Sequence, residues 1–402
     1  MTVTSAGSAV RPEVKALAPA LVDSRRHFHR YPELSWKEHR TQEAILDRLR
    51  AIEGLDDVRP IARTGATALV RGGRPGPCVL WRADIDALPV PEKSGLPYAS
   101  ENDGVMHACG HDTHIAIALG IAQVLVERRD ELAGSVRFVF QPAEEAEGGA
   151  RDCIEEGILE EPYVSRAFGL HISADVPLGA INVAPGPFFA APTGFVIEIE
   201  GRGGHAAAPH QGIDAVVVAA HCITALQTVV SRSVNPLDTA VLTVGTVKGG
   251  YRRNVMAESA RMGGTIRTYD ERVLELMLKR TEEVVGGVCA AFGATFSLSH
   301  NTGCPPLVND EAETAMVMDL AASFFGADNI YSTPSMGAED MAEFLRARPG
   351  CFFWLGARNE AKGIAGRHHD PGFLIDEDAL PLGVEFGARI LESALAEDAV
   401  SG

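Results

Sequence analysis

Short apolar segments that alternate with helical stretches constrain the fold of this chain most strongly. Four apolar runs look like buried strands, at residues 78–81, 136–140, 167–170 and 351–355. Helices are expected at residues 12–30, 36–53, 112–129, 148–158, 310–326, 338–347 and 378–396. Buried strands that alternate with helices are typical of an α/β domain with a mostly parallel sheet. We therefore predict such a sheet, flanked by helices.

A second, smaller domain is expected inside the first. Pro/Gly clusters at 184–187 and 302–306 bracket a segment whose pattern reads β-α-β-β-α-β. That order is typical of a ferredoxin-like α+β domain with an antiparallel sheet. We predict this domain at residues 187–301. The flanking segments, 1–186 and 302–402, are then expected to form one discontinuous catalytic domain.

The charge balance argues against two classes of partner. Lys and Arg number 36 and Asp and Glu number 54, so the formal net charge of the 402 residues is −18. A chain with this excess of negative charge is not expected to bind nucleic acid or an anionic membrane surface in general. A local positive site for a small anion remains compatible with it.

Three further features point to the cytoplasm. The first twenty residues have no long apolar core of the kind found in signal peptides. The uncharged span 215–231 is short for a bilayer and contains several polar residues, so we expect a buried helix there. Seven scattered cysteines, an odd number, predict free thiols in a reducing compartment.

Polar clusters follow three of the expected strands. Residues 82–86 read RADID, residues 141–145 read QPAEE, and His171 follows the third strand. In open α/β sheets, ligands bind beyond the carboxyl ends of the strands. Three acidic or histidine-containing clusters at three such ends therefore predict one shared site.

The residue types in these clusters indicate metal binding. Residues 107–114 read HACGHDTH, and Cys109 and His111 flank a glycine there. Thiolate, imidazole and carboxylate are the ligands of zinc and similar divalent ions. By itself this motif is equally compatible with a buried thiol beside a surface histidine. Glu145, His171 and the pair His368–His369 strengthen the metal interpretation.

The pair Glu144–Glu145 has two readings. Adjacent acids are usually a solvated surface feature, yet these follow an apolar run and a proline, where a catalytic loop is expected. One carboxylate can bind metal while its neighbour takes a proton from the attacking water.

The glycine-rich stretch 201–204 lacks dinucleotide-binding spacing and predicts a tight turn, with His205 at its tip.

Taken together, these motifs resemble those of the co-catalytic, di-metal metallopeptidase and amidohydrolase family. That family contains aminoacylases, carboxypeptidases, hippurate hydrolases and hydrolases of indole-acetyl amino acids, and the chain is most similar to the N-acyl-amino-acid amidohydrolase branch. The matching strings, in order, are FHRYPELSWKE, RADIDALPVPE, HACGHDTH, FQPAEEAEGGA, GLH, GRGGHAAAPH, GAED and HHDPGFLIDEDAL. They span nearly the whole chain. The resemblance implies the two-domain layout, with the small domain as lid and dimer interface.

The resemblance also implies a role for individual residues. Cys109 would bridge two metals, at a position where other branches use an aspartate. His111 and His171 would ligate one metal, and Glu145 and His369 the other. His369 is preferred to His368 because the histidine of the branch lies two residues before the proline, here Pro371. The residues assigned other roles are Glu144 as general base and then acid, Asp86 as a support for the ligands, and His205, Asn254 and Arg267 as lid contacts to the substrate carboxylate or the developing oxyanion.

The expected activity is metal-dependent hydrolysis of the amide bond of N-acyl-L-amino acids or small dipeptides. The acyl group is left open among acetyl, benzoyl as in hippurate, indole-acetyl and long-chain groups. The cofactor is expected to be two divalent ions per chain, zinc, manganese, cobalt or nickel, and the assembly a homodimer. Two alternatives remain: a catalytically silent binding homologue, and an amidase that uses Cys109 as nucleophile. His114 and His368 are expected to contact ligands, and His368 is also an alternative ligand.

Overall fold

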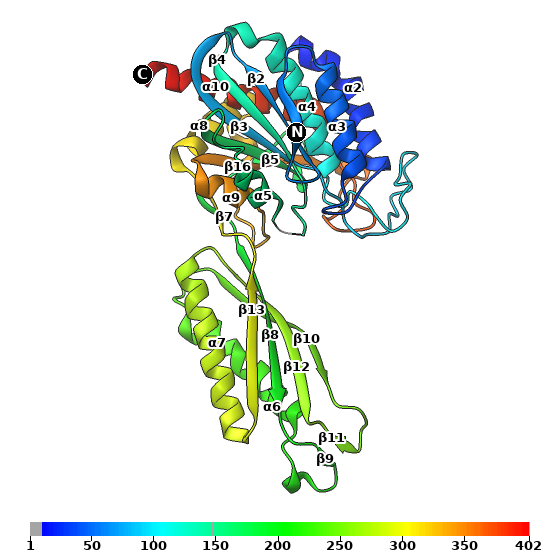
Figure 1. Cartoon of the computed structure of the whole chain (residues 1–402), viewed down its shortest axis with the longest axis vertical. Coiled ribbons are helices and arrows are strands. Elements are labelled where there is room, and N and C mark those ends of the chain that lie inside the picture. The colour runs from blue at the N-terminus through cyan, green and yellow to red at the C-terminus, as the bar shows by residue number, and fades with distance from the viewer. Residues whose placement is uncertain (1–9, 147, 402) are drawn as a thin grey trace. The chain divides into compact units, whose positions relative to one another are not determined.

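The chain forms two compact units in the computed structural model, which describes residues 10–146 and 148–401 (Figure 1). Unit 1 contains the residues up to Phe188, Val308–Pro334 and the residues from Asp340 onward. Unit 2 contains Phe189–Leu307 and the short segment Ser335–Glu339, compared with the predicted 187–301. Sequence patterning did not reveal that segment, because it joins unit 2 through backbone contacts, including Ala190 N–H to Gly337 O at 2.9 Å. The prediction that no signal peptide is present rests partly on residues 1–9, which lie outside the described residues.

Unit 1 is built on a mixed eight-stranded sheet. The strands lie in the order β1 (Asp56–Ile61), β2 (Gly65–Arg71), β4 (Ala133–Gln141), β3 (Arg74–Asp84), β5 (Val164–Pro177), β16 (Gly350–Arg358), β6 (Ile181–Asn182) and β15 (Ile330–Tyr331). The four predicted strands are the parallel centre, β4-β3-β5-β16. β1, β2 and β6 join it in antiparallel pairings that the sequence analysis did not predict. β7 (Gly186–Phe189) and β14 (Leu307–Asn309) form a separate two-stranded ribbon.

Helices cover the sheet of unit 1. They are α2 (Pro12–Arg30), α3 (His39–Ala51), α4 (His111–Glu127), α5 (Gly149–Glu155), α8 (Glu311–Phe324), α9 (Met341–Ala347) and α10 (Ala379–Ser401). α4 and α10 pack on β3, with α2 against both of them, while α5 and α9 pack together on β4, β5 and β16. After its polar first turn, α4 is mostly apolar, and it is almost entirely buried, as expected of a helix enclosed between a sheet and other helices.

Unit 2 contains a four-stranded antiparallel sheet in the order β10 (Ala240–Gly249), β12 (Ser259–Thr268), β8 (Ala191–Glu200) and β13 (Thr295–Thr302). Helices α6 (Ala215–Thr228) and α7 (Glu271–Phe292) pack together and on this sheet. Their buried side chains share one core with alternate residues of the strands. A small ribbon of β9 (Gly204–His205) and β11 (Val255–Met256) completes the unit.

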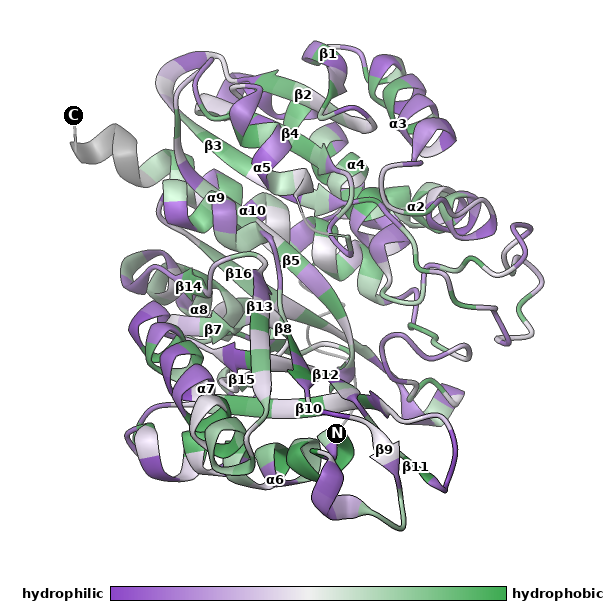
Figure 2. Ribbon diagram, turned by 60° about the horizontal axis from the view of Figure 1, so that its bottom comes forward, coloured by the Kyte–Doolittle hydropathy of each residue, from purple (hydrophilic) through white to green (hydrophobic). Residues whose placement is uncertain are grey.

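The prediction of a buried helix at 215–231 is wrong for one face of α6. Val218 and Cys222 are buried, whereas Val216 and Val217 are 43% and 44% exposed. Because α6 is hydrophobic on nearly all sides (Figure 2), composition did not reveal which face packs. Among the described residues, Ala215–Ser233 is also the one helical stretch long and apolar enough to cross a membrane by length and composition.

Candidate metal centre

The end of β3 brings two aspartates to the carboxyl edge of the sheet. Asp84 accepts a charge-assisted hydrogen bond from Arg82 Nη1 at 2.5 Å, and both residues are buried. Asp86 follows two residues later and is also buried. Its Oδ2 accepts hydrogen bonds from Ser35 Oγ at 2.6 Å and from the backbone N–H of Glu145 at 3.0 Å. Asp86 therefore joins the loop after β4 to the end of β3.

A left-handed turn places Cys109 and His111 at the start of α4. Gly110 between them has φ +88°, and a Cβ there would lie 2.4 Å from Ile172 Cγ2 of β5. Only glycine adopts this conformation readily and allows so close an approach. The glycine that separates the two candidate ligands in the sequence thus has a specific geometric role.

Cys109 is shared by two groups of possible metal donors. One group combines Cys109, His111 and Glu145, and the other combines Cys109, His171 and His368. The donor atoms within each group lie within 4.8 Å of one another. Sγ of Cys109 is 3.4 Å from Nε2 of His171. The structure therefore brings four of the five predicted ligands together around one sulfur atom.

The fifth predicted ligand, His369, lies next to this cluster. Its Nε2 is 3.2 Å from Oε1 of Glu145, and its backbone φ is +66°. The groups differ from the expected pairing, since His111 groups with Glu145 rather than with His171. Asp86 holds Nδ1 of His111, through its backbone oxygen at 2.9 Å and its Oδ1 at 3.3 Å, and thereby orients the ring.

The donor set fits divalent cations. Nε2 of His111 is buried and has no hydrogen-bonding partner among the described residues, so its lone pair is available to a cation. Burial lowers the pKa of His111, but the carboxylates of Asp84 and Asp86 outweigh it and raise the pKa to about 10. A position that holds a proton so strongly also suits a metal cation, and thiolate, imidazole and carboxylate suit ions such as zinc.

The remaining histidines of α4 and β5 are held by the protein itself. His114 Nδ1 is hydrogen-bonded to Asp84 Oδ1, and its Nε2 accepts the backbone N–H of Ile172 at 2.8 Å. Nδ1 of His171 donates to the backbone oxygen of Ile172 at 2.7 Å, which leaves its Nε2 facing Cys109. The second nitrogen of a ligating histidine is usually fixed in this way.

The surroundings of Cys109 do not activate it as a free nucleophile. Burial raises the pKa of the Cys109 thiol well above its usual value, and the charges of Glu145 and Glu144 raise it further. Reactive cysteines have the opposite surroundings, electropositive and with a lowered pKa. These surroundings therefore disfavour a free thiolate nucleophile at Cys109, whereas a bound cation would itself deprotonate a coordinating thiol.

Glu144 lies in a loop of unusual backbone geometry. The preceding Ala143 has φ +52°, and its backbone N–H donates to Oε1 of the buried Glu38 at 2.9 Å. Thr64 Oγ1 donates to the other oxygen of Glu38 at 2.7 Å. The sequence analysis missed Glu38 and Ser35, although both lie in or near the FHRYPELSWKE string, because their contacts are with distant segments.

The three candidate residues of unit 2 are not gathered at one point of that unit. His205 and Asn254 are exposed and lie together at the β9–β11 ribbon, where the backbone N–H of Ala206 donates to Asn254 O at 3.2 Å. Arg267 is near the end of β12 and pairs with Pro192 of β8 and Val241 of β10. β11 precedes the start of β12, so the length of β12 separates Arg267 from the other two.

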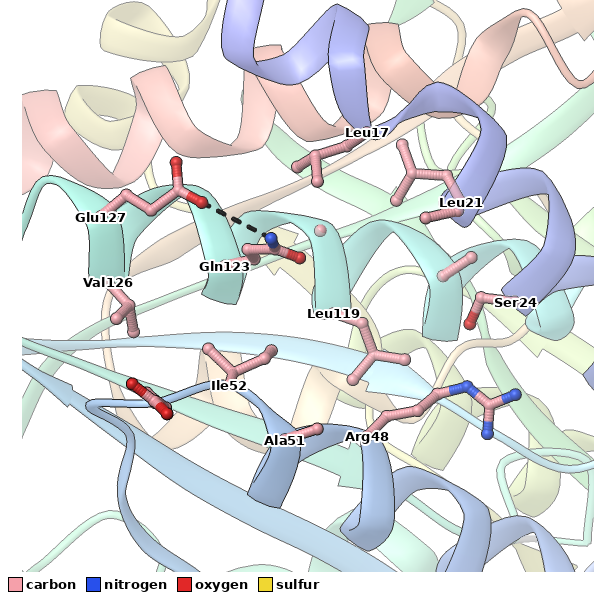
Figure 3. A pocket seen from close by; sticks show the side chains of 14 residues that line it. Leu17, Leu21, Ser24, Arg48, Ala51, Ile52, Leu119, Gln123, Val126 and Glu127 are labelled. Atoms are coloured by element: carbon pink, nitrogen blue, oxygen red, sulfur yellow. Dashed lines mark hydrogen bonds between the residues drawn. The ribbon is translucent and has the colours of Figure 1, made fainter.

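A pocket of about 540 Å³ lies elsewhere in unit 1, between α2, α3 and α4 (Figure 3). Leu17 and Leu21 line it from α2, Leu119 and Val126 from α4, and Ile52 from the residue after α3. It contains none of the candidate metal donors. This pocket therefore does not mark the candidate metal centre, which is located by the chemistry of its donors.

A helix-flanked mixed sheet with clustered thiolate, imidazole and carboxylate donors at its carboxyl edge defines a metal-dependent hydrolase. The model of Peptidase family M20/M25/M40 matches residues 80–393, and the chain belongs to this family. The enzyme accordingly catalyses metal-dependent hydrolysis of amide bonds.

Known proteins resemble the chain over nearly its full length. It is 43% identical over 370 residues to N-acetyl-L-cysteine deacetylase of Bacillus subtilis, covering 91% of this chain and 86% of the relative. It is 37% identical to thermostable carboxypeptidase 1 of Saccharolobus solfataricus, covering 93% and 95%. The crystal structure of the Bacillus subtilis YXEP protein, described as a dinuclear metal-binding peptidase, superposes with a TM-score of 0.83 at 34% identity, covering 95% and 99%.

Proposed function

We propose that this enzyme hydrolyses N-acyl-L-amino acids or small dipeptides at a two-metal centre bridged by Cys109. The observation that carries the proposal is that Sγ of Cys109 lies within 4.8 Å of donor atoms of His111 and Glu145 in one group and of His171 in another. The names of the two relatives support the substrate class, since removing an acetyl group from N-acetylcysteine and releasing a carboxy-terminal residue both break an amide at an amino-acid nitrogen. Zinc, manganese, cobalt and nickel are the proposed metals, in line with the donor types.

The residues of unit 1 divide the proposed chemistry among them. Divalent cations in such a centre supply Lewis acidity and make water nucleophilic near neutral pH. The carboxylate of Glu144 accepts a proton from the attacking water and returns it to the nitrogen of the leaving amine. Asp86 keeps His111 in its ligating orientation.

The residues of unit 2 are proposed as substrate contacts of the lid. Arg267 is half-buried, and within the part of the chain that the structure describes its buried Nη1 has no hydrogen-bonding partner. A guanidinium in that state is suited to bidentate pairing with a carboxylate, such as that of the amino-acid half of the substrate. His205 and Asn254, which the length of β12 separates from Arg267 of the same chain, are proposed as donors to the oxyanion of a substrate bound by the second copy of a dimer, a type of contact that contributes about 3–4 kcal/mol per donor in studied enzymes.

The experiment that tests this function combines metal content with a substrate panel. Purified protein is assayed on N-acetyl, N-benzoyl and indole-acetyl amino acids and on dipeptides, before and after chelation. We expect close to two metals per chain, and activity that is lost with chelator and restored by Zn²⁺, Mn²⁺ or Co²⁺. Turnover without metal would support the Cys109 nucleophile instead. Metal binding without turnover on any substrate would support a silent homologue.

The assignment of the general base has its own test. Glu144→Gln keeps the size of the side chain but cannot accept a proton, so kcat should fall by a factor of about 100 to 10,000. Metal content should stay at the wild-type level. Glu155→Gln, at an exposed position of α5, is the matched control and should retain full activity. An active Glu144→Gln enzyme would show that another group moves the proton.

We also propose that two copies associate through unit 2. β10 is an edge strand, and its Val241 and Val247 are 37% and 52% exposed. Val247 pairs with the buried Met262 and therefore lies on the helix-covered face, where the exposed Val216 of α6 lies beside Gly249 of the same strand, whereas Val241 pairs with Arg267 on the other face. Long apolar edges are normally protected or paired. Antiparallel pairing of β10 with β10 of a second copy would cover this one.

Analytical ultracentrifugation tests the dimer. The double variant Val241→Lys with Val247→Lys should sediment as a monomer, because like charges then face each other across the paired edges. Thr295→Lys with Ser299→Lys adds the same charge at the opposite edge strand, β13, and should leave a dimer. A wild-type chain that sediments as a monomer at micromolar concentration would contradict the proposal.

The seven cysteines are all buried free thiols, which supports the proposed reducing, cytoplasmic location.

A further inference from the structure

His368 has a more closely defined environment than its neighbour His369. Its ring centroid lies 4.9 Å from that of Phe373 and 5.6 Å from that of Trp354. The ring of His171 stands edge-on to it, with centroids 5.3 Å apart. Aromatic contacts on several sides restrict the rotation of the His368 ring. The directions of its two nitrogens are therefore set by the packing.

The hydrogen bonds of His368 identify which nitrogen carries the proton. Its Nε2 accepts the backbone N–H of Ala174 at 3.4 Å. A ring nitrogen that accepts a hydrogen bond is unprotonated, so the neutral imidazole carries its hydrogen on Nδ1. Nδ1 faces Sγ of Cys109 at 3.7 Å. A metal ligand would need a lone pair at this nitrogen, but Nδ1 has an N–H there.

We propose that His368 is a positioning residue that donates an Nδ1–H···S hydrogen bond to the sulfur of Cys109 and is not itself a metal ligand. This inference rests on the proposed metal centre, in which that sulfur is a bridging thiolate. The donor is useful at this place because Glu144 and Glu145 add negative charge around Cys109. A hydrogen bond from a neutral ring stabilises the thiolate without adding a competing cation. His369, next to Glu145, remains the ligand of the pair.

An isosteric pair of variants tests this role in the cobalt-loaded enzyme. Asparagine places an N–H₂ group as many bonds from Cα as Nδ1 of histidine, whereas leucine places a methyl group there. Both His368→Asn and His368→Leu should bind as much Co²⁺ as the wild type. The sulfur-to-cobalt charge-transfer band of His368→Leu should move to longer wavelength, because its thiolate loses a hydrogen bond. The band of His368→Asn should stay near the wild-type position.

Three results would overturn the proposal. They are an unshifted band in His368→Leu, loss of cobalt from both variants, and an Nε2–H tautomer for His368 in ¹⁵N-histidine NMR of the wild type. The NMR measurement does not depend on the folding of any variant. Cys109→Ser separates this inference from the underlying function, since the band must disappear in it. A wild-type spectrum with no such band would contradict the bridging thiolate. A band whose wavelength is the same in His368→Leu would contradict only the hydrogen bond from His368.

Discussion

At the scale of single residues, the candidate centre also contains carboxylates that are not among the proposed metal ligands. Asp86 is the clearest of them. Its oxygens contact the hydroxyl of Ser35, the backbone N–H of Glu145 and Nδ1 of His111, which belong to three separate segments. One buried side chain thus fixes two proposed ligands relative to each other.

Replacing Asp86 should weaken metal binding more than it weakens the fold. In Asp86→Asn the negative charge beside His111 is lost, and an amide N–H₂ can face groups that donate hydrogen bonds, so Nδ1 of His111 keeps only the backbone oxygen of residue 86 as its partner. We expect metal affinity to fall by about 10–100-fold, the usual effect of removing such a supporting group. Competition with a fluorescent chelator measures this. Ser35→Ala removes one donor but keeps the carboxylate, and should have the smaller effect. Equal metal affinity in wild type and Asp86→Asn would contradict the assigned role.

The sequence predicted the kinds of residue at the centre, but not how they are grouped. Four of the proposed ligands could be identified because the sequence itself shows their side-chain chemistry and their positions close to predicted strands. They are Cys109, His111, Glu145 and His171. The distinct places of His368 and His369 were not, since they depend on a positive φ at His369 and on ring packing around His368. Glu38 was missed because its role consists of contacts with Ala143 and Thr64, far away in the sequence.

At the scale of elements, the turn before α4 sets the approach of the ligands to β5. Gly110 combines a positive φ with the close contact to Ile172. Gly95 in the same long loop has φ +70° but has nothing within 4 Å of an added Cβ. Alanine variants at these two positions therefore separate the free-energy cost of the left-handed backbone conformation from the cost of steric crowding by the added Cβ.

Alanine at these two positions should give different results. Both variants pay about 1–2 kcal/mol for the left-handed conformation. Gly110→Ala adds overpacking of typically 1–3 kcal/mol, and it should lose bound metal because Cys109 and His111 must shift. Gly95→Ala should keep its metal. Thermal unfolding and metal analysis of the two proteins check this. If Gly110→Ala kept its full metal content, the turn would not position the ligands.

Most elements were predictable because their periodicity is local. The helices and the four central strands of unit 1, and the strand and helix order of unit 2, follow from apolar spacing. β1 and β2 were not predicted, since β1 reads DDVRPI and carries charges that are uncommon in strands. The exposure of Val216 and Val217 was also missed, because a helix that is apolar on every side gives no signal for the face that packs.

At the scale of the whole molecule, metal binding should stabilise one unit only. All five proposed ligands belong to unit 1. A ligand present at 100 times its dissociation constant adds about 2.7 kcal/mol to the stability of the structure that binds it. Removing metal should therefore speed hydrogen exchange in α4 and leave α7 of unit 2 unchanged, as measured by mass spectrometry. Equal acceleration in both helices would show that the metals stabilise the units together.

The two ends of unit 2 have a consequence for the history of the chain. Thr193 near its beginning and Thr302 near its end pair across neighbouring strands, and their hydroxyls are 3.2 Å apart. A folded insert whose ends already meet imposes on its host only the closure entropy of a short loop, however many residues it contains. Unit 2 can therefore be exchanged or rebuilt during evolution without changing the strand register of the unit 1 sheet, beside which the proposed ligands lie. For the same reason, protein engineers can replace it with a short turn.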